Sequence, residues 1–164
     1  LNLIHGNKFK YIGVDLFGTS QKHQKNEIEP NFLKHQKFSN PLKNIYYNYI
    51  LKENLNSLES NKRLLRKYEK NIKLIAGDTN EVLKKIDLSS IDFVFLDGGH
   101  SYTTVLNDLG VIYKSLRNKN TVILCDDYGE ESLIKEVKNA IDDFTKTNNI
   151  KLSIIENRFA KLII

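Results

Sequence analysis

From residue 71 onward, short apolar runs alternate with amphipathic stretches. The runs at 71–76, 92–97 and 121–126 are rich in Ile, Val, Leu and Phe, which is typical of strands buried on both faces. The stretches at 102–117 and 131–147 place apolar residues on one face of a helix. These residues are Val105, Leu109, Ile112 and Leu116 in the first stretch, and Ile134, Val137, Ile141 and Phe144 in the second. The alternation predicts an α/β fold that is Rossmann-like and doubly wound, with a mostly parallel sheet.

The amino-terminal part has a less regular pattern. A further strand is predicted at 11–16, where the run YIGVDLF is apolar and β-branched. Residues 18–44 are polar and contain both prolines, which predicts an irregular excursion or lid with at most one short helix. Residues 44–69 have helical character, with a break expected near 54–57.

The chain closes with two apolar runs, 150–156 and 158–164, that have almost no turn between them. This spacing predicts a hairpin whose last strand is antiparallel to the rest of the sheet. A short helix is predicted at 79–86, with Thr79 as its candidate N-cap. We therefore expect one domain over residues 1–164.

The net charge of +5 raises the question of a nucleic-acid partner. The basic excess comes from 21 Lys against only four Arg, although Arg is the better ligand for phosphates and base edges. Residues 1–76 carry 14 basic and 6 acidic side chains, whereas residues 77–164 carry 11 and 14. The aspartates of interest lie in the acidic half, which argues against nucleic acid as the partner.

Two further features concern the compartment. The sequence holds no apolar run long enough for a transmembrane helix, so no membrane association is expected. The single Cys125 excludes an internal disulfide and fits a reducing, cytoplasmic compartment. We interpret Cys125 as a small buried hydrophobe on a strand rather than as a reactive thiol.

Aspartates follow four of the predicted strands: Asp15, Asp78, Asp97 and the pair Asp126-Asp127. In open α/β sheets, ligands bind beyond the carboxyl ends of the strands. Any one of these residues could be a helix N-cap or a solvated loop residue. The whole set is harder to explain by packing, because a carboxylate that is buried without a partner is costly.

Asp97, Asp126 and Asp127 follow adjacent strands and could converge. Three carboxylates that share a site repel one another unless a cation intervenes, and oxygen ligands favour Mg²⁺, Ca²⁺ or Mn²⁺. His100 follows three residues after Asp97, and Gly98 and Gly99 permit a tight turn and close approach of a ligand. Histidine titrates near neutral pH and is suited to general-base catalysis. The alternative is a surface-loop histidine without a role.

Four segments resemble one enzyme family when they are taken in order: YIGVDLF, IKLIAGDTNEVL, IDFVFLDGGHSY and VILCDDY. They are similar to class I S-adenosylmethionine-dependent methyltransferases, and within these to the metal-dependent sugar and macrolide O-methyltransferases. The resemblance covers residues 11–164 except 18–44. It implies methylation of a small hydroxylated molecule, with S-adenosylmethionine and a divalent cation, expected to be Mg²⁺, as cofactors.

The resemblance also implies roles for individual residues. Asp15 would bind the ribose hydroxyls of S-adenosylmethionine, and Asp78 would lie by its adenine. Asp97, Asp126 and Asp127 would hold the cation, and His100 would be the catalytic base.

One part of the family pattern is missing. The family's first strand and glycine-rich loop would precede residue 11, and the segment LNLIHGNKFK is too short to supply them. We therefore expect an amino-terminally truncated domain that lacks the strand between those at 11–16 and 92–97. Two alternatives stay open: a non-catalytic fragment of the same fold, and a basic module that uses the Lys-rich segment 18–70 to bind an anionic partner.

Overall fold

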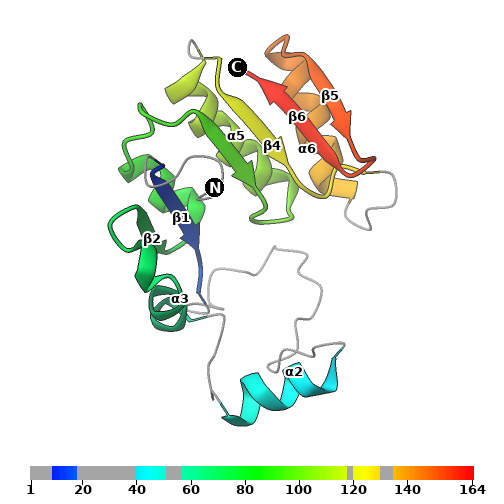
Figure 1. Ribbon diagram of the computed structural model, residues 1–164. Coiled ribbons are helices and arrows are strands. Elements are labelled where there is room, and N and C mark those ends of the chain that lie inside the picture. The colour runs from blue at the N-terminus through cyan, green and yellow to red at the C-terminus, as the bar shows by residue number, and fades with distance from the viewer. Residues whose placement is uncertain (1–8, 18–39, 51–56, 118–119, 130–134) are drawn as a thin grey trace. The chain divides into compact units, whose positions relative to one another are not determined.

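The computed structural model describes residues 9–17, 40–50, 57–117, 120–129 and 135–164 (Figure 1). Contacts within the chain divide it into two compact units. The described residues up to Asp78 belong to the first unit, and those from Thr79 to Ile164 belong to the second. The expectation of one domain over 1–164 stays a prediction.

The first unit contains a two-stranded parallel sheet. Strand β1 (Tyr11–Asp15) pairs with β2 (Ile72–Ala76), with Asp15 opposite Ala76. The N–H of Gly77 donates to the carbonyl of Asp15 at 3.0 Å and extends the pairing by one residue. Both strands lie where the sequence predicts them. Their parallel register places Asp15 and Asp78 at the same edge of this sheet.

Helical segments lie between these two strands in the sequence. They are α2 (Pro41–Ile45), the π-helical η1 (Tyr46–Ile50), α3 (Leu58–Leu64) and the 3₁₀ turn η2 (Arg66–Tyr68). Helix α2 begins inside the predicted excursion because Asn40 caps it, accepting from the N–H of Leu42 at 2.9 Å, and Pro41 fits its first position. Helix α3 begins after Ser57, in agreement with the predicted break. Residues 18–39 and 51–56 lie outside the described part.

The apolar side chains of the α2–η1 segment whose burial is described are largely exposed, with Leu42 at 74% and Tyr49 at 72%. Ile45 and Tyr49 share a helix face, as the pattern at 44–69 predicts, but this face does not form a buried core.

The second unit is built on a four-stranded sheet with the order β3-β4-β6-β5. Its elements are α4 (Thr79–Val82), η3 (Leu83–Lys85), β3 (Phe93–Leu96), α5 (Tyr102–Leu116), β4 (Val122–Cys125), α6 (Lys135–Thr147), β5 (Leu152–Ile155) and β6 (Phe159–Ile163). Strand β6 is antiparallel to both neighbours, and β3 and β4 are parallel. The predicted mostly parallel Rossmann-like sheet with a reversed final strand is confirmed. None of the helices in the described ranges is long and apolar enough to cross a membrane.

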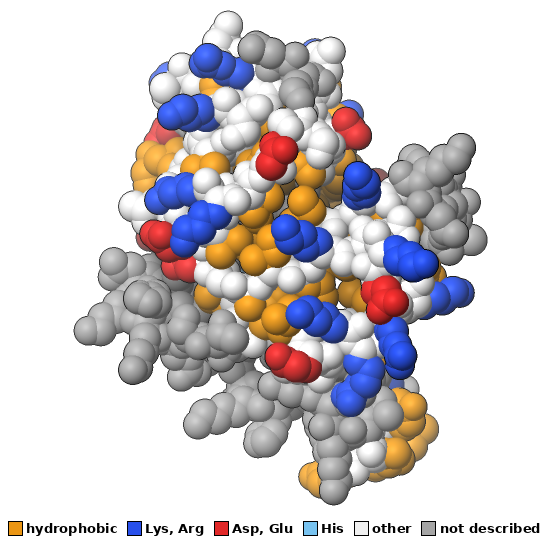
Figure 2. Space-filling model, turned by 90° about the vertical axis from the view of Figure 1, so that its left-hand side faces the viewer, with side chains coloured by type: hydrophobic (Ala, Val, Ile, Leu, Met, Phe, Trp, Pro, Cys, Tyr) orange, Lys and Arg blue, Asp and Glu red, His pale blue; other side chains and the backbone are white. Residues whose placement is uncertain are grey.

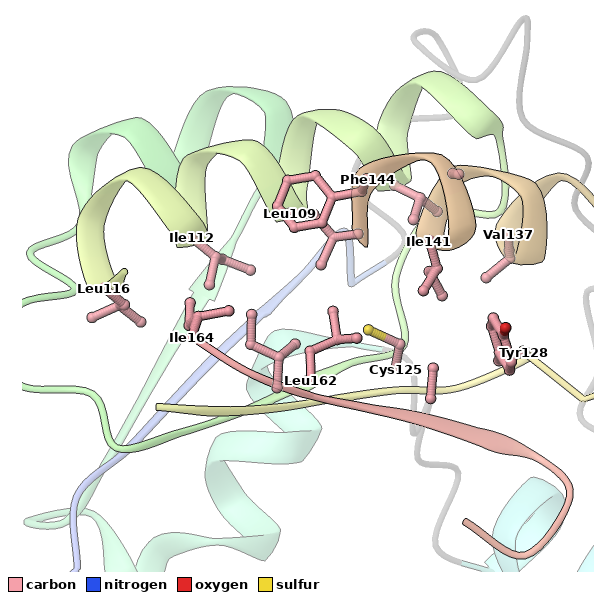
Figure 3. Close-up of a cluster of buried hydrophobic side chains, with 14 of the residues drawn as sticks. Leu109, Ile112, Leu116, Cys125, Tyr128, Val137, Ile141, Phe144, Leu162 and Ile164 are labelled. Atoms are coloured by element: carbon pink, nitrogen blue, oxygen red, sulfur yellow. The ribbon is translucent and has the colours of Figure 1, made fainter. Parts of the chain in front are cut away.

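Helices α5 and α6 pack side by side over one face of this sheet (Figures 1 and 3). Both predicted apolar stripes are buried wherever they are described, whereas Ile134 lies outside the described residues. The fully buried apolar side chains include Leu109, Leu116, Ile123, Ile141 and Leu162. The opposite face leaves Phe93 and Phe95 about half exposed, at 56% and 50%.

Two smaller predictions have different outcomes. Thr79 is the first residue of α4 rather than its N-cap, because the chain already turns into the helix there. The expected interruption of the sheet stays a prediction. Strands β1 and β3 belong to separate sheets among the described strands, but residues 1–8 lie outside the described part.

The turn of the β5–β6 hairpin rests on the end of β4. Glu156 and Asn157 both have φ of 52°, as a type I′ turn requires, and the N–H of Arg158 donates to the carbonyl of Ile155 at 3.1 Å. The N–H groups of Tyr128 and Gly129 both donate to the carbonyl of Arg158 at 3.0 Å. Because β6 is reversed, its turn lies at the edge where β3 and β4 end.

Gly129 makes this close approach feasible, and its replacement tests the arrangement. A Cβ at Gly129 would overlap the carbonyl oxygen of Asn157, whereas a Cβ at Gly110 in α5 would meet nothing within 4 Å. We expect Gly129→Ala to lower the free energy of unfolding by about 1–3 kcal/mol. The matched control Gly110→Ala should raise it by about 0.5–1 kcal/mol, because alanine is the better helix former. Urea denaturation measures both changes, and equal stability of the two variants would contradict the packing described here.

Candidate functional site

The site begins where β3 and β4 end. Leu96 pairs with Cys125, and the N–H of Asp126 continues the ladder by donating to the carbonyl of Leu96 at 3.0 Å. Asp97 and Asp126 therefore follow adjacent strands at the same level. The sequence prediction that these strand ends bring acidic residues together is correct for this edge.

The loop after β3 delivers His100 to the same edge. Ser101 caps α5 by accepting from the N–H of Thr104 at 3.3 Å, and this cap fixes His100 just before the helix. His100 Nε2 lies 3.2 Å from Asp127 Oδ2, and the histidine side chain is 16% exposed. His100 is therefore part of the acidic edge and not a fully solvated loop residue.

The two glycines of this loop were expected to permit a tight turn and close approach of a ligand. Neither Gly98 nor Gly99 has a positive φ, so the backbone conformation of the loop is one that other residues also adopt. A Cβ at Gly98 would meet only Asp108 Oδ2, at an ordinary 3.9 Å. The chain's own packing therefore leaves space beside Gly98, which fits the other half of the expectation, close approach of a ligand.

Three side chains at this edge could share one ion. Asp97, His100 and Asp127 each offer one ligand atom, and these atoms lie within 4.8 Å of one another. Asp97 is exposed, whereas His100 and Asp127 are half-buried. Asp127 has a φ of 56°, a left-handed conformation that Asp tolerates better than most residues. Two carboxylates and an imidazole in this arrangement suit a divalent cation.

Asp126, the third predicted ligand, has a different partner. Its Oδ1 and Oδ2 accept from Nε and Nη2 of Arg158 at 2.6 and 2.5 Å, and its Oδ1 also accepts from the N–H of Asp127 at 2.8 Å. The Arg158 hydrogen bond is the main cause that lowers the pKa of Asp126. Its predicted role as a ligand stays a prediction, and it is not one of the three residues that lie together.

The pKa of Asp97 is shifted in the opposite direction. Desolvation raises the pKa of Asp97, and the negative charges of Asp126 and Asp127 raise it further, against smaller opposing effects of His100 and Arg158. The site therefore holds one acid whose charged form is disfavoured and one whose charged form is stabilised.

A small recess opens beneath these residues. Its lining includes the polar residues Asp97, His100, Asp126 and Asp127 and apolar residues such as Val105 and Cys125. Burial raises the pKa of the Cys125 thiol to about 12, so the thiol stays protonated near neutral pH. The interpretation of Cys125 as a buried hydrophobe is confirmed.

The sequence reasoning missed two residues near the recess. Arg158 follows the hairpin turn, and the reversal of the last strand was the signal that could have placed it at this edge. Asp108 is 1% exposed on α5, and its Oδ2 lies near Gly98. An acid directly beside Leu109 on the predicted apolar stripe was the signal for Asp108.

Asp15 and Asp78, the predicted cofactor residues, lie in the first unit. Asp15 Oδ1 accepts from the N–H of Phe17 at 2.6 Å and shapes the chain just after β1. Asp78 follows β2 at the same edge of the two-stranded sheet. Their roles stay predictions.

The fold defines the class as Rossmann-like α/β, and comparison with known proteins specifies the family. A family model described as a methyltransferase domain matches residues 2–128. The chain therefore belongs to this methyltransferase family.

Among solved structures, the chain is similar to a Staphylococcus aureus protein named "putative caffeoyl-CoA O-methyltransferase". The TM-score is 0.50 at 12% identity, over 99% of this chain and 79% of that chain, which shows a shared fold. A search of curated protein sequences found no match.

The contrast between Asp97 and Asp126 predicts opposite effects of the same substitution on stability. Because the pKa of Asp97 is raised in the folded state, the free energy of unfolding decreases as the pH rises through and above the ordinary pKa of 3.8. Asp97→Asn should therefore stabilise the chain at neutral pH, and this gain should vanish in acid. Because the pKa of Asp126 is lowered in the folded state, its charged form contributes to stability above the ordinary pKa of 3.8. This contribution is lost as the pH falls through the folded-state pKa.

Asp126→Asn should accordingly destabilise the chain at neutral pH, with a deficit that shrinks in acid. Thermal melting between about pH 3 and pH 7.5, with a chelator present, compares the two variants with the natural chain. Changes of the same sign at neutral pH would contradict this electrostatic assignment.

Proposed function

We propose that the chain is an S-adenosylmethionine-dependent O-methyltransferase that acts on a small hydroxylated molecule with the help of a divalent cation. The match of the methyltransferase family over residues 2–128 supports the reaction class. The convergence of Asp97, His100 and Asp127 beside a recess is the observation that carries the finer proposal.

Asp15 and Asp78 are the proposed cofactor residues. A carboxylate oxygen can accept more than one hydrogen bond, so Asp15 can keep its bond from Phe17 and still accept from a ribose hydroxyl. Asp78 lies at the same edge and is proposed to lie by the adenine. The resemblance to class I methyltransferases supports both roles.

Asp97 and Asp127 fit the proposed cation, because each has a carboxylate oxygen within 4.8 Å of the other, a span that one ion can bridge. When bound, S-adenosylmethionine supplies an electrophilic methyl group, and a divalent cation lowers the pKa of a hydroxyl group that it contacts. The chain's own residues must then orient the acceptor and remove its proton.

His100 is the proposed base. Its Nε2 lies 3.2 Å from Asp127 Oδ2, so this carboxylate can stabilise the imidazolium that forms when the ring takes up a proton. The ring is half-buried and borders the small recess.

Cofactor binding tests whether the chain is a working methyltransferase domain or a non-catalytic fragment. We expect S-adenosylhomocysteine to bind with measurable heat in calorimetry. Asp15→Asn should weaken binding by about tenfold or more, because charged hydrogen bonds are the stronger ones. The control Asp92→Asn changes an aspartate before β3 and should bind like the natural chain. Absence of binding by the natural chain would favour the fragment.

The role of His100 is tested by kinetics. With an acceptor found by screening small hydroxylated molecules, methyl transfer should become faster as the pH rises through the range in which histidine loses its proton. His100→Ala should lower kcat by about two to four orders of magnitude while S-adenosylhomocysteine affinity stays nearly constant.

Mn²⁺ affinity separates the base from a ligand. If His100 is the base, His100→Ala should bind Mn²⁺ within about threefold of the natural chain, whereas loss of a metal ligand costs more. Retention of most activity at neutral pH would remove the base assignment, and a joint loss of Mn²⁺ affinity and activity would make His100 a ligand instead.

A further inference from the structure

Arg158 joins the acidic edge from the far end of the chain. Its guanidinium makes two hydrogen bonds to Asp126, whose side chain is 5% exposed, although the arginine side chain itself is 61% exposed. The guanidinium carbon also lies 5.0 Å from the ring centroid of Phe159. The carbonyl of Arg158 accepts from Tyr128 and Gly129. Both the backbone and the side chain of Arg158 are thereby fixed at this edge.

This ion pair uses both oxygens of Asp126. Oδ1 accepts from Arg158 Nε and from the N–H of Asp127, while Oδ2 accepts from Arg158 Nη2. A bidentate arginine offsets the charge of a carboxylate and holds both of its oxygens toward the guanidinium. The group of residues that could share an ion contains Asp127 and not its neighbour Asp126.

We infer that Arg158 is a positioning residue that withdraws Asp126 from the cation site and leaves Asp97 and Asp127 as its carboxylate ligands. This inference rests on the cation proposed above. Of the two adjacent aspartates, Asp126 is then a structural residue and Asp127 is a ligand. It also limits cation affinity, because affinity for hard cations depends on the number of charged ligands.

The inference is tested by titrating Mn²⁺ into the full chain in a calorimeter. Arg158→Ala releases Asp126 and makes the site more negative, so Mn²⁺ should bind about tenfold tighter than to the natural chain. The double variant Arg158→Ala/Asp126→Asn has the natural net charge, and the amide that it introduces keeps an oxygen that can accept from the N–H of Asp127. Its Mn²⁺ affinity should return to within about threefold of the natural value, whereas Asp127→Asn should lose at least about tenfold.

Two controls address charge and folding. Lys161→Ala removes a positive charge from the same strand, at a position paired with Leu124, and should leave the affinity nearly unchanged. Arg158→Lys retains the charge without the bidentate geometry and should give an affinity between those of the natural chain and Arg158→Ala. Far-ultraviolet circular dichroism establishes that each variant is folded, and Arg158→Lys provides the comparison if Arg158→Ala is not.

The outcomes distinguish this inference from the proposed function. If the natural chain binds Mn²⁺ and the double variant loses affinity as Asp127→Asn does, Asp126 is a ligand and the inference is overturned while the cation stands. Unchanged or weaker binding by folded Arg158→Ala would also overturn it. If no variant binds Mn²⁺, the proposed cation itself fails, and the inference fails with it.

Discussion

The antiparallel pairing of β6 with β4 is the constraint on which the site depends. A strand parallel to β4 would begin at the opposite edge of the sheet, far from the aspartates. The reversal instead places the hairpin turn beside Asp126 and Asp127, where the carbonyl of Arg158 accepts two backbone hydrogen bonds. The buried layer formed by α5 and α6 holds β4 and β6 in this register, because Ile123 and Leu162 are fully buried. Figure 3 shows Leu162 beneath the helices.

The acidic edge shows how one fold separates carboxylates that are close in sequence. Asp126 is charged and paired, whereas the pKa of Asp97 is raised by desolvation and by its acidic neighbours. The arrangement is typical of functional sites, where groups are held in environments that disfavour their ordinary ionisation.

Family membership and site geometry contribute different information. The family supplies the reaction class, and the similar solved structure supplies the fold. The case for a cation-assisted O-methyltransferase rests on the described residues around the recess. The basic excess that suggested an anionic partner does not form a uniform patch on the face in Figure 2, where lysine and arginine side chains are interspersed with acidic and hydrophobic ones.

The sequence by itself determined the strand positions, the helices α5 and α6, and the strand ends that carry the aspartates. These features follow from the period of the apolar residues and from the chemistry of strand ends, which are local properties. It could not determine which aspartates face one another. Asp126 pairs with Arg158, which is remote in sequence and is brought to this edge by the reversal of β6, whereas Asp127 lies beside His100.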